Sequence, residues 1–187
     1  MTVVAPAGAP HHAAARSADP SRGDPPPPDP DSHPMDVRIV EFSETPVAAA
    51  EHRGPPALEH DTARRLIAWR IAHRLPPDRH ATYGVHHTDP RTTPPAEHSV
   101  DICVAYDGEV APNAEGVVAK VIPACRCAVA RHHGSRENVT AATELVERWL
   151  PASGERPRDF PLFFHYVNVG PHVRDEEMIT DVYLPLR

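Results

Sequence analysis

The feature that most constrains this chain is an internal similarity at a constant offset of 80 residues. Identical residues recur at this offset without a gap: His52 and His132, Gly54 and Gly134, Trp69 and Trp149, and Asp101 and Asp181. The chain has only two tryptophans, so their presence in the same register as a glycine and an aspartate is difficult to attribute to chance. Self-similarity at a fixed period indicates that one structural unit occurs twice.

The first copy shows the pattern of two strands, one helix and two further strands. Short apolar runs bounded by turn residues predict strands at residues 37–42, 47–52, 81–87 and 99–106. Between the second and third runs, Gly54 and two prolines can open a helix, because the amide groups of a first turn have no helical partner. Spacings of three and four predict one buried helix face: Leu58, Thr62, Leu66, Trp69 and Ala72. The nearby arginines are expected to face water: Arg64, Arg65, Arg70 and Arg74.

The second copy repeats this order, with strands predicted at residues 117–122, 126–132, 162–168 and 178–184. A helix is expected after Ser135, which can cap its first amides. The apolar face of that helix is formed by Val139, Ala142, Leu145, Val146 and Trp149. One helix and a few short strands cannot enclose a core alone, so the two copies are expected to pack together. The predicted fold class is α+β, with antiparallel sheets, one main helix in each repeat (residues 37–107 and 117–187) and a cleft between the repeats.

Residues 1–36 have a different composition from the rest of the chain. They are rich in Ala, Pro, His and Asp, include four consecutive prolines at 25–28, and contain almost no large apolar side chain. Such a segment cannot bury enough surface to order itself, so a disordered tail is predicted. Met35 directly precedes the first patterned residue and is an alternative start of translation.

Charge, cysteine content and hydropathy argue against several classes of protein. The formal net charge is -7 and no basic cluster is present, so direct binding of nucleic acid is not expected. The cysteines Cys103, Cys125 and Cys127 are odd in number and lie in apolar runs, which argues against a disulfide framework and favours a reducing, cytoplasmic location. No apolar run is long enough to predict a membrane span.

Neither a metal nor another cofactor is predicted. Cys125 and Cys127 would share one strand face, but no second pair of ligands stands at a spacing typical of zinc sites. His86, His87 and His98 form another cluster of metal-ligand residue types. Adjacent histidines in a strand point to opposite faces, however, so these histidines are expected to be solvated.

Four stretches of the chain resemble a known family: residues 46–55, 149–154, 159–168 and 180–186. The segments Trp-Leu-Pro-Ala-Ser-Gly at 149–154 and Asp-Val-Tyr-Leu-Pro-Leu at 181–186 are the most specific in combination. In these stretches the chain is similar to the GyrI-like small-molecule-binding domain, the effector-binding part of AraC-type and MerR-type multidrug regulators, which also occurs alone. The resemblance implies two strand-helix-strand-strand repeats of the SHS2 type, related by a pseudo-twofold axis, with the ligand between them.

The resemblance also implies where a ligand would bind. Members of the family hold flat, hydrophobic, often cationic compounds between aromatic side chains, beside a glutamate in a Phe-Glu-x-Tyr pattern. Here Phe164 takes the glutamate's place, so the buried charge that would select a cation is missing. Because side chains alternate along a strand, Phe164 and Tyr166 are expected to face the cleft together. Tyr183 joins them by the resemblance, and the 80-residue offset adds His86 and Cys103 as counterparts of Tyr166 and Tyr183.

Trp69 and Trp149 complete the set of predicted ligand contacts, although tryptophan on an apolar helix face more often belongs to the core. The leading hypothesis is a stand-alone effector-binding protein that binds or sequesters a hydrophobic, aromatic small molecule, since no helix-turn-helix pattern precedes Val37.

Two alternatives remain open. One is a hydrolase that opens reactive natural products in the same pocket. With Phe164 at the glutamate position no catalytic residue is assigned, and Glu51, His86 or His165 would have to serve as the base. The other is a protein partner such as DNA gyrase, because inhibition of gyrase by one member gave the family its name.

Overall fold

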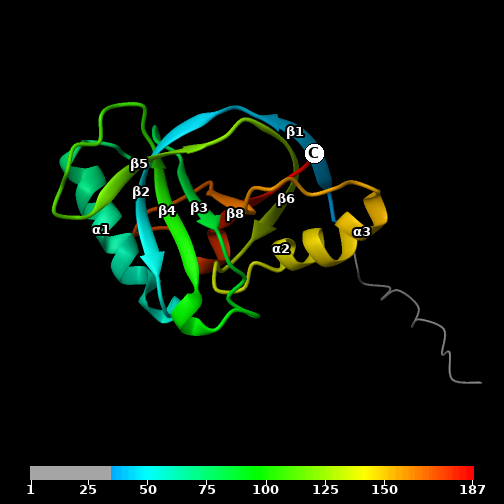
Figure 1. Cartoon of the computed structure of the whole chain (residues 1–187). Coiled ribbons are helices and arrows are strands. Elements are labelled where there is room, and N and C mark those ends of the chain that lie inside the picture. The colour runs from blue at the N-terminus through cyan, green and yellow to red at the C-terminus, as the bar shows by residue number, and fades with distance from the viewer. Residues whose placement is uncertain (1–34) are drawn as a thin grey trace, which may run out of the picture. The chain divides into compact units, whose positions relative to one another are not determined.

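A computed structural model describes residues 35–187 of the chain, so the predicted tail of residues 1–36 lies almost entirely outside the described residues. The described part forms one antiparallel sheet of eight strands, in the order β1-β6-β8-β7-β3-β4-β2-β5 (Figure 1). The strands are β1 (Val37–Phe42), β2 (Thr45–Arg53), β3 (Thr82–His86), β4 (Ser99–Ala105), β5 (Val117–Ile122), β6 (Cys125–His133), β7 (Phe163–Tyr166) and β8 (Ile179–Pro185). Every predicted strand is present, with ends that differ by at most two residues.

The main helical segments follow β2 and β6. They are a 3-10 turn (Pro56–Leu58) continued by α1 (Glu59–Ala72), and α2 (Thr140–Glu144) continued by a π-helical turn (Leu145–Trp149) and α3 (Leu150–Ser153). Pro151 has no amide hydrogen for an α-helical bond, and the wider turn lies directly before it. Short 3-10 turns at Pro95–Glu97 and Asp175–Glu177 precede β4 and β8. None of the described helices has the length and apolar character needed to span a membrane.

The strand registers of the two halves differ by the same offset as the sequence. Ala49 pairs with Cys103 between β2 and β4, and Val129 pairs with Tyr183 between β6 and β8. The halves join at the centre of the sheet through β3 and β7, where Gly84 lies opposite Phe164. Each half also pairs its first strand with the other half, β1 with β6 and β5 with β2. The prediction of separate sheets is therefore wrong. Each half would leave its central strand with an unpaired edge, and pairing β3 with β7 satisfies those backbone groups in one continuous sheet.

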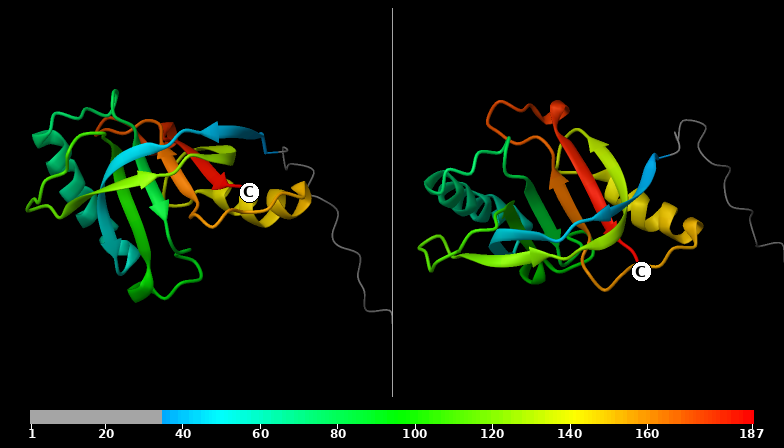
Figure 2. Two further views of the ribbon diagram at one scale, coloured as in Figure 1. Left: turned by 45° about the horizontal axis from the view of Figure 1, so that its top comes forward. Right: turned by 90° about the horizontal axis from the view of Figure 1, so that it is seen from above.

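Both main helices cover the same face of the sheet. In the first half, Leu66 and Trp69 of α1 belong to one apolar cluster with Ala48, Ala50 and Val104 of the sheet. Alanine presents little side chain, so a helix can lie close above it. Figure 2 shows α1 and the α2–α3 segment at opposite ends of the sheet, with the central strands between them.

The second half builds the equivalent layer with other residues. Leu145 of the π-helical turn clusters with Ala128, Ala130 and Val182. Ala128 and Ala130 occupy the same alternating positions in β6 as Ala48 and Ala50 in β2, and their side chains point to the same face of the sheet. Both helical layers therefore lie on one face, called the helix face below.

The opposite face carries an aromatic cluster. Phe163 and Tyr183 stack with ring centroids 4.8 Å apart, and Phe42 meets both rings edge to face. Tyr83 packs in the same cluster. Apolar side chains thus fill both faces of the central strands.

Five expectations about the helices are wrong. Ser135 does not cap α2, which begins at Thr140; its hydroxyl accepts a bond from the amide of Glu137 in the preceding turn. Leu58, Ala72 and Val146 are exposed rather than buried. Arg70 does not face water, because its guanidinium is buried and bonded to the segment that follows α1.

Candidate functional site

The centre of the helix face lies over β3 and β7, between the two helical layers. Gly84 and Phe164 point to this face, and so do His86 and Tyr166, which lie two residues further along β3 and β7. The rings of His86 and Phe164 are 4.2 Å apart, and those of Phe164 and Tyr166 are 6.2 Å apart. The structure therefore brings together three of the residues predicted to bind a ligand. We call His86, Phe164 and Tyr166 the central cluster.

Gly84 makes this close packing feasible. A Cβ atom at position 84 would lie 2.5 Å from Tyr166 Oη and 3.2 Å from His86 Nε2. The phenol of Tyr166 thus lies across β3 in space that any side chain at position 84 would take. Burial raises the pKa of Tyr166, which keeps the phenol protonated at neutral pH.

His86 is a neutral member of the central cluster. Burial lowers its pKa to about 4, and the neighbouring His98 and His87 add to the effect. A neutral imidazole at neutral pH can accept a hydrogen bond at one ring nitrogen and donate at the other.

Three buried polar atoms at this site have no hydrogen-bond partner among the described residues. They are His86 Nε2, Thr180 Oγ1 and Arg136 Nε. Thr180 lies opposite Tyr166 in the β7–β8 pair, and the Arg136 guanidinium carbon lies 4.9 Å from the centre of the Tyr166 ring. Buried polar groups are normally bonded, so a group of unpaired ones around a single ring marks a place that can receive polar atoms of a ligand.

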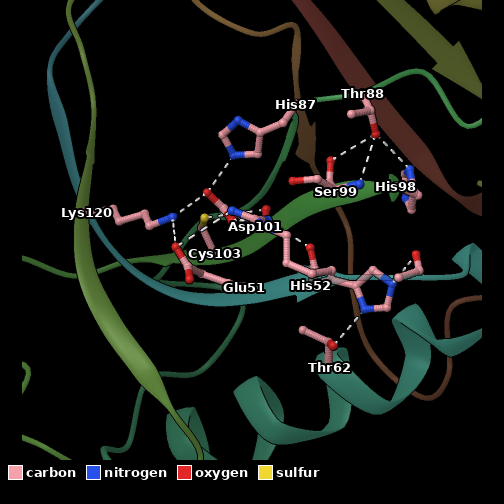
Figure 3. Close-up of polar contacts among 12 residues, drawn as sticks. Glu51, His52, Thr62, His87, Thr88, His98, Ser99, Asp101, Cys103 and Lys120 are labelled. Carbon is pink, nitrogen blue, oxygen red and sulfur yellow. Dashed lines mark hydrogen bonds and ion pairs between the residues drawn. The ribbon is translucent and has the colours of Figure 1, made fainter. Parts of the chain in front are cut away.

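The matched region of the first half is closed by its own bonds. His98 is only 1% exposed, and its ring bonds Glu59 Oε1 at 2.8 Å and Thr88 Oγ1 at 3.0 Å. Figure 3 shows His98 beside Thr88 and Ser99. The expectation that the histidines are solvated is therefore wrong for His98, because the fold places a carboxylate and a hydroxyl against its two ring nitrogens. It is also wrong for His86, whose Nε2 is buried.

A second polar network surrounds Asp101 on the other face of the sheet (Figure 3). Oδ2 of Asp101 lies 2.7 Å from both His87 Nε2 and Lys120 Nζ, and Lys120 also pairs with Glu51. Burial alone would raise the pKa of Asp101, but the bonds from His87 and Lys120 outweigh it and lower the pKa to about 2. This network stabilises the fold.

Asp181, the counterpart of Asp101, binds one partner. Its two oxygens accept bonds of 2.7 and 2.8 Å from Arg131. The partners of both aspartates come from strands and from the residue that follows β3.

Two predicted ligand contacts lie away from the central cluster. Tyr183 pairs with Phe163 across β7–β8, and Cys103 pairs with Tyr83 across β3–β4, so both point to the aromatic cluster of the opposite face. The prediction that they share a cleft with Phe164 is wrong. The sequence shows which residues alternate within one strand, but the relation between strands depends on their register.

The two tryptophans occupy different environments. Trp69 is 2% exposed and stacks on His73 in the core of the first half, so it is a core residue. Trp149 is half-buried and packs against the apolar cluster of the second half.

Two surface hollows of the described structure lie elsewhere. One of about 270 Å³ is lined by residues including Pro46, His80 and Tyr106, and one of about 380 Å³ lies along α2 near Asn138 and Arg148. Neither contains a residue predicted to bind the ligand. The described residues hold no group of three or more side chains suited to a metal, and all three cysteines are unpaired.

Sequence reasoning missed Gly84, Arg136 and Thr180. Arg136 corresponds to Pro56 at the 80-residue offset, and Thr180 corresponds to Val100. Both are positions where the two copies differ in polarity, and this difference is the signal that could have identified them.

Comparison with known proteins places this geometry in a family. A family model described as a GyrI-like small molecule binding domain matches residues 35–187. The probable transcriptional regulator YgiV of Escherichia coli K12 is 37% identical over 154 residues, which cover 81% of this chain and 96% of YgiV. A DNA gyrase inhibitor of Erwinia billingiae is 30% identical over 156 residues, which cover 81% of this chain and 97% of the inhibitor.

Among solved structures, the C-terminal domain of EcmrR has a TM-score of 0.64 at 15% identity, covering 82% of this chain and 98% of that domain. This similarity concerns the fold alone. The family match over the whole described region and the identity with YgiV lead to one conclusion. The chain belongs to the GyrI-like small-molecule-binding family, which is related to the effector-binding domains of transcription regulators.

Proposed function

We propose that this chain binds a hydrophobic, aromatic small molecule at the central cluster, on the helix face of the sheet. The observation that carries the proposal is the convergence of His86, Phe164 and Tyr166 around Gly84, with unpaired polar atoms beside them. Small-molecule sites combine apolar and aromatic walls with a few polar groups that fix orientation. The central cluster has that composition.

We also propose that the two halves are SHS2-type repeats related by a pseudo-twofold axis. The palindromic strand order and the registers that repeat at an offset of 80 residues support this relation. Gly84 and Phe164 are themselves 80 residues apart and lie opposite each other, so the axis would pass between them. The ligand would then lie at the seam of the repeats.

Each member of the central cluster has a proposed role. Phe164 is the apolar platform on which a flat ring stacks, since offset stacking of aromatic rings is favourable. Tyr166 covers the space above Gly84, and the ligand takes that space when the phenol rotates away. Neutral His86 supplies one hydrogen bond.

Thermal unfolding in the presence of aromatic compounds tests the proposal. A panel of neutral, anionic and cationic aromatic compounds should include members that raise the melting temperature. A ligand that binds the folded state stabilises it by about 2.7 kcal/mol when its free concentration is 100 times Kd. Phe164→Leu should abolish the increase. Tyr183→Leu changes an aromatic residue on the opposite face and is the control, which should retain it. Equal losses in both variants, or no stabilisation of the unmodified protein, would contradict the proposed site.

A hydrolase in the same pocket is a second candidate. His86 is the member of the central cluster that could act as a general base, and its imidazole is unprotonated at neutral pH. A base with a pKa of about 4 removes a proton from water poorly, so we propose binding rather than turnover. Product formation that disappears in His86→Gln would favour the enzyme.

A protein partner is a third candidate. It is favoured by one observation, the 30% identity with a relative named DNA gyrase inhibitor. The test is whether gyrase subunits co-purify with the immobilised chain. If a ligand from the thermal panel abolishes this co-purification, the partner binds at or near the central cluster.

A further inference from the structure

We infer that the ligand carries an anionic group, such as a carboxylate, beside its aromatic part, and that Arg136 binds this group. The inference rests on the proposed function and specifies the chemistry of its ligand. It depends on Arg136 and Thr180, two residues that no resemblance assigns.

Arg136 is a partly buried cation without an ion-pair partner among residues 35–187. Its terminal nitrogen donates to the carbonyl of Asn168, while Nε has no partner. No carboxylate of the described residues lies within ion-pair distance of this guanidinium. Burial lowers the pKa of Arg136, which shows that its surroundings disfavour the charge. A buried charge is normally paired, so an anion from outside is the missing component.

Arg70 shows what a structural arginine of this protein looks like. Its Nε donates to Leu75 at 2.9 Å, one terminal nitrogen donates to Thr82 at 3.0 Å, and the other donates to His80 at 3.1 Å. All three nitrogens of Arg70 are used, although it too lacks a carboxylate partner. Among the described residues, Arg136 donates a hydrogen bond through one nitrogen only, which leaves Nε available to a ligand.

Thr180 supplies a second donor on the same side of the sheet. Its side chain is completely buried and its hydroxyl has no partner among the described residues. Thr180 lies opposite Tyr166, and Arg136 lies over the Tyr166 ring, so both donors surround one position. A guanidinium with a neighbouring hydroxyl is well suited to a planar carboxylate, which accepts several bonds at once.

The other charged groups around the site do not supply the counterion. Glu59 bonds His98, and Asp89 is paired with Arg91. Asp175 is exposed and acts on Arg136 only through space. The central cluster itself contains neutral His86 and no carboxylate.

A cationic ligand would meet an occupied position. Cations bind above the face of an aromatic ring, and Arg136 already lies there, 4.9 Å from the centre of the Tyr166 ring. A cation placed beside it would be repelled by the guanidinium. The geometry therefore favours an aromatic anion over an aromatic cation.

Titration calorimetry with three matched compounds tests the inference: 2-naphthoate, neutral 2-naphthamide and cationic 2-naphthylmethylammonium. We expect 2-naphthoate to bind at least about tenfold more tightly than the other two, since a charge-assisted hydrogen bond contributes about 1.5 kcal/mol or more. Arg136→Gln should weaken binding of 2-naphthoate at least about tenfold and leave 2-naphthamide unchanged. Arg148→Gln removes an exposed arginine from the π-helical turn after α2 and is the matched control.

Each outcome discriminates between the proposals. Equal binding of 2-naphthoate and 2-naphthamide, with loss of both in Phe164→Leu, overturns the inference and leaves the proposed function intact. Tightest binding of the cation, lost in Glu59→Gln, overturns it as well. Failure of all three compounds to bind contradicts the proposed function and the inference together. If Arg136→Gln does not fold, Arg136→Lys serves instead, and it should weaken 2-naphthoate selectively because lysine cannot form the two parallel bonds of a guanidinium.

Discussion

The two halves of the molecule share one backbone pattern but differ in how polar groups at matched positions are bonded. In the first half, His98 bonds both Glu59 and Thr88, and the group closes on itself. The second half has Met178 and Val139 at the matched positions of His98 and Glu59, so no such bonds can form. Instead, Arg136 Nε and Thr180 Oγ1 have no hydrogen-bond partner within the described part of the chain.

This difference indicates how a duplicated fold acquires a one-sided site. Backbone pairing depends on main-chain hydrogen bonds, which tolerate many side chains, and the registers agree between the halves. Side chains at matched positions are free to diverge, as in His86 and Tyr166. One half can then bond its polar groups internally, as at His98, while the other presents donors, as at Arg136 and Thr180. The predictions below test how far this division extends.

The largest expected effect separates the two tryptophans. Trp69→Ala should lower the free energy of unfolding by about 3–5 kcal/mol, because it removes a fully buried ring. Trp149→Ala should cost about half as much, since this ring is half-buried. Urea denaturation of both variants measures the ratio. Equal costs would show that the halves contribute equally to stability.

His86 should contribute to the pH dependence of stability, as should His165, whose pKa burial also lowers. The pKa of His86, about 4 in the folded chain, lies below the ordinary value of 6.5, so the unfolded state binds more protons as the pH falls from 6.5 towards 4. Stability is complete above pH 6.5 and decreases below it, by at most about 3 kcal/mol at pH 4. His86→Gln should reduce this decrease when denaturation is repeated across that range. Tyr166, its counterpart, does not ionise there. An unchanged profile would contradict the buried, neutral imidazole.

The smallest of these effects compares the matched aspartates. Asp101→Asn should lower stability at pH 7 by about 2 kcal/mol, because the pKa of Asp101 is held at about 2 against an ordinary 3.8. This contribution is present above pH 4 and is lost as the pH falls through 2. Asp181→Asn should cost about 1 kcal/mol, since its single partner Arg131 is partly exposed. Chemical denaturation at pH 7 distinguishes the two values, and a larger cost for Asp181→Asn would reverse the comparison.

Much of the fold could be predicted from local pattern. The 80-residue offset and the apolar runs identified all eight strands and the position of both main helices. Alternation within β7 correctly placed Phe164 and Tyr166 on one face. Gly54 and Gly134, which recur at this offset, both adopt positive φ, of 126° and 107°.

The errors arose where contacts between distant segments determine the direction of a side chain or its hydrogen-bond partners. Tyr183 was assigned to the wrong face because its direction depends on pairing with Phe163, twenty residues earlier in the chain. Arg70 was expected to face water, but the segment after α1 folds back and surrounds its guanidinium with acceptors. The unpaired donors of Arg136 and Thr180 could not be predicted either. Whether a donor is unpaired depends on every neighbour in space, and those neighbours come from distant parts of the chain.

By itself the sequence determined that two similar units occur in tandem, where their strands and helices lie, and which family they resemble. These properties depend on periodicity, which is local and can be counted along the chain. Only the tertiary structure decided that the units share one sheet through β3 and β7, and that three buried polar atoms around the central cluster have no partner among the described residues: His86 Nε2, Arg136 Nε and Thr180 Oγ1. The physical reason is that register, burial and hydrogen-bond saturation are relations between residues far apart in the chain, and no local pattern specifies them.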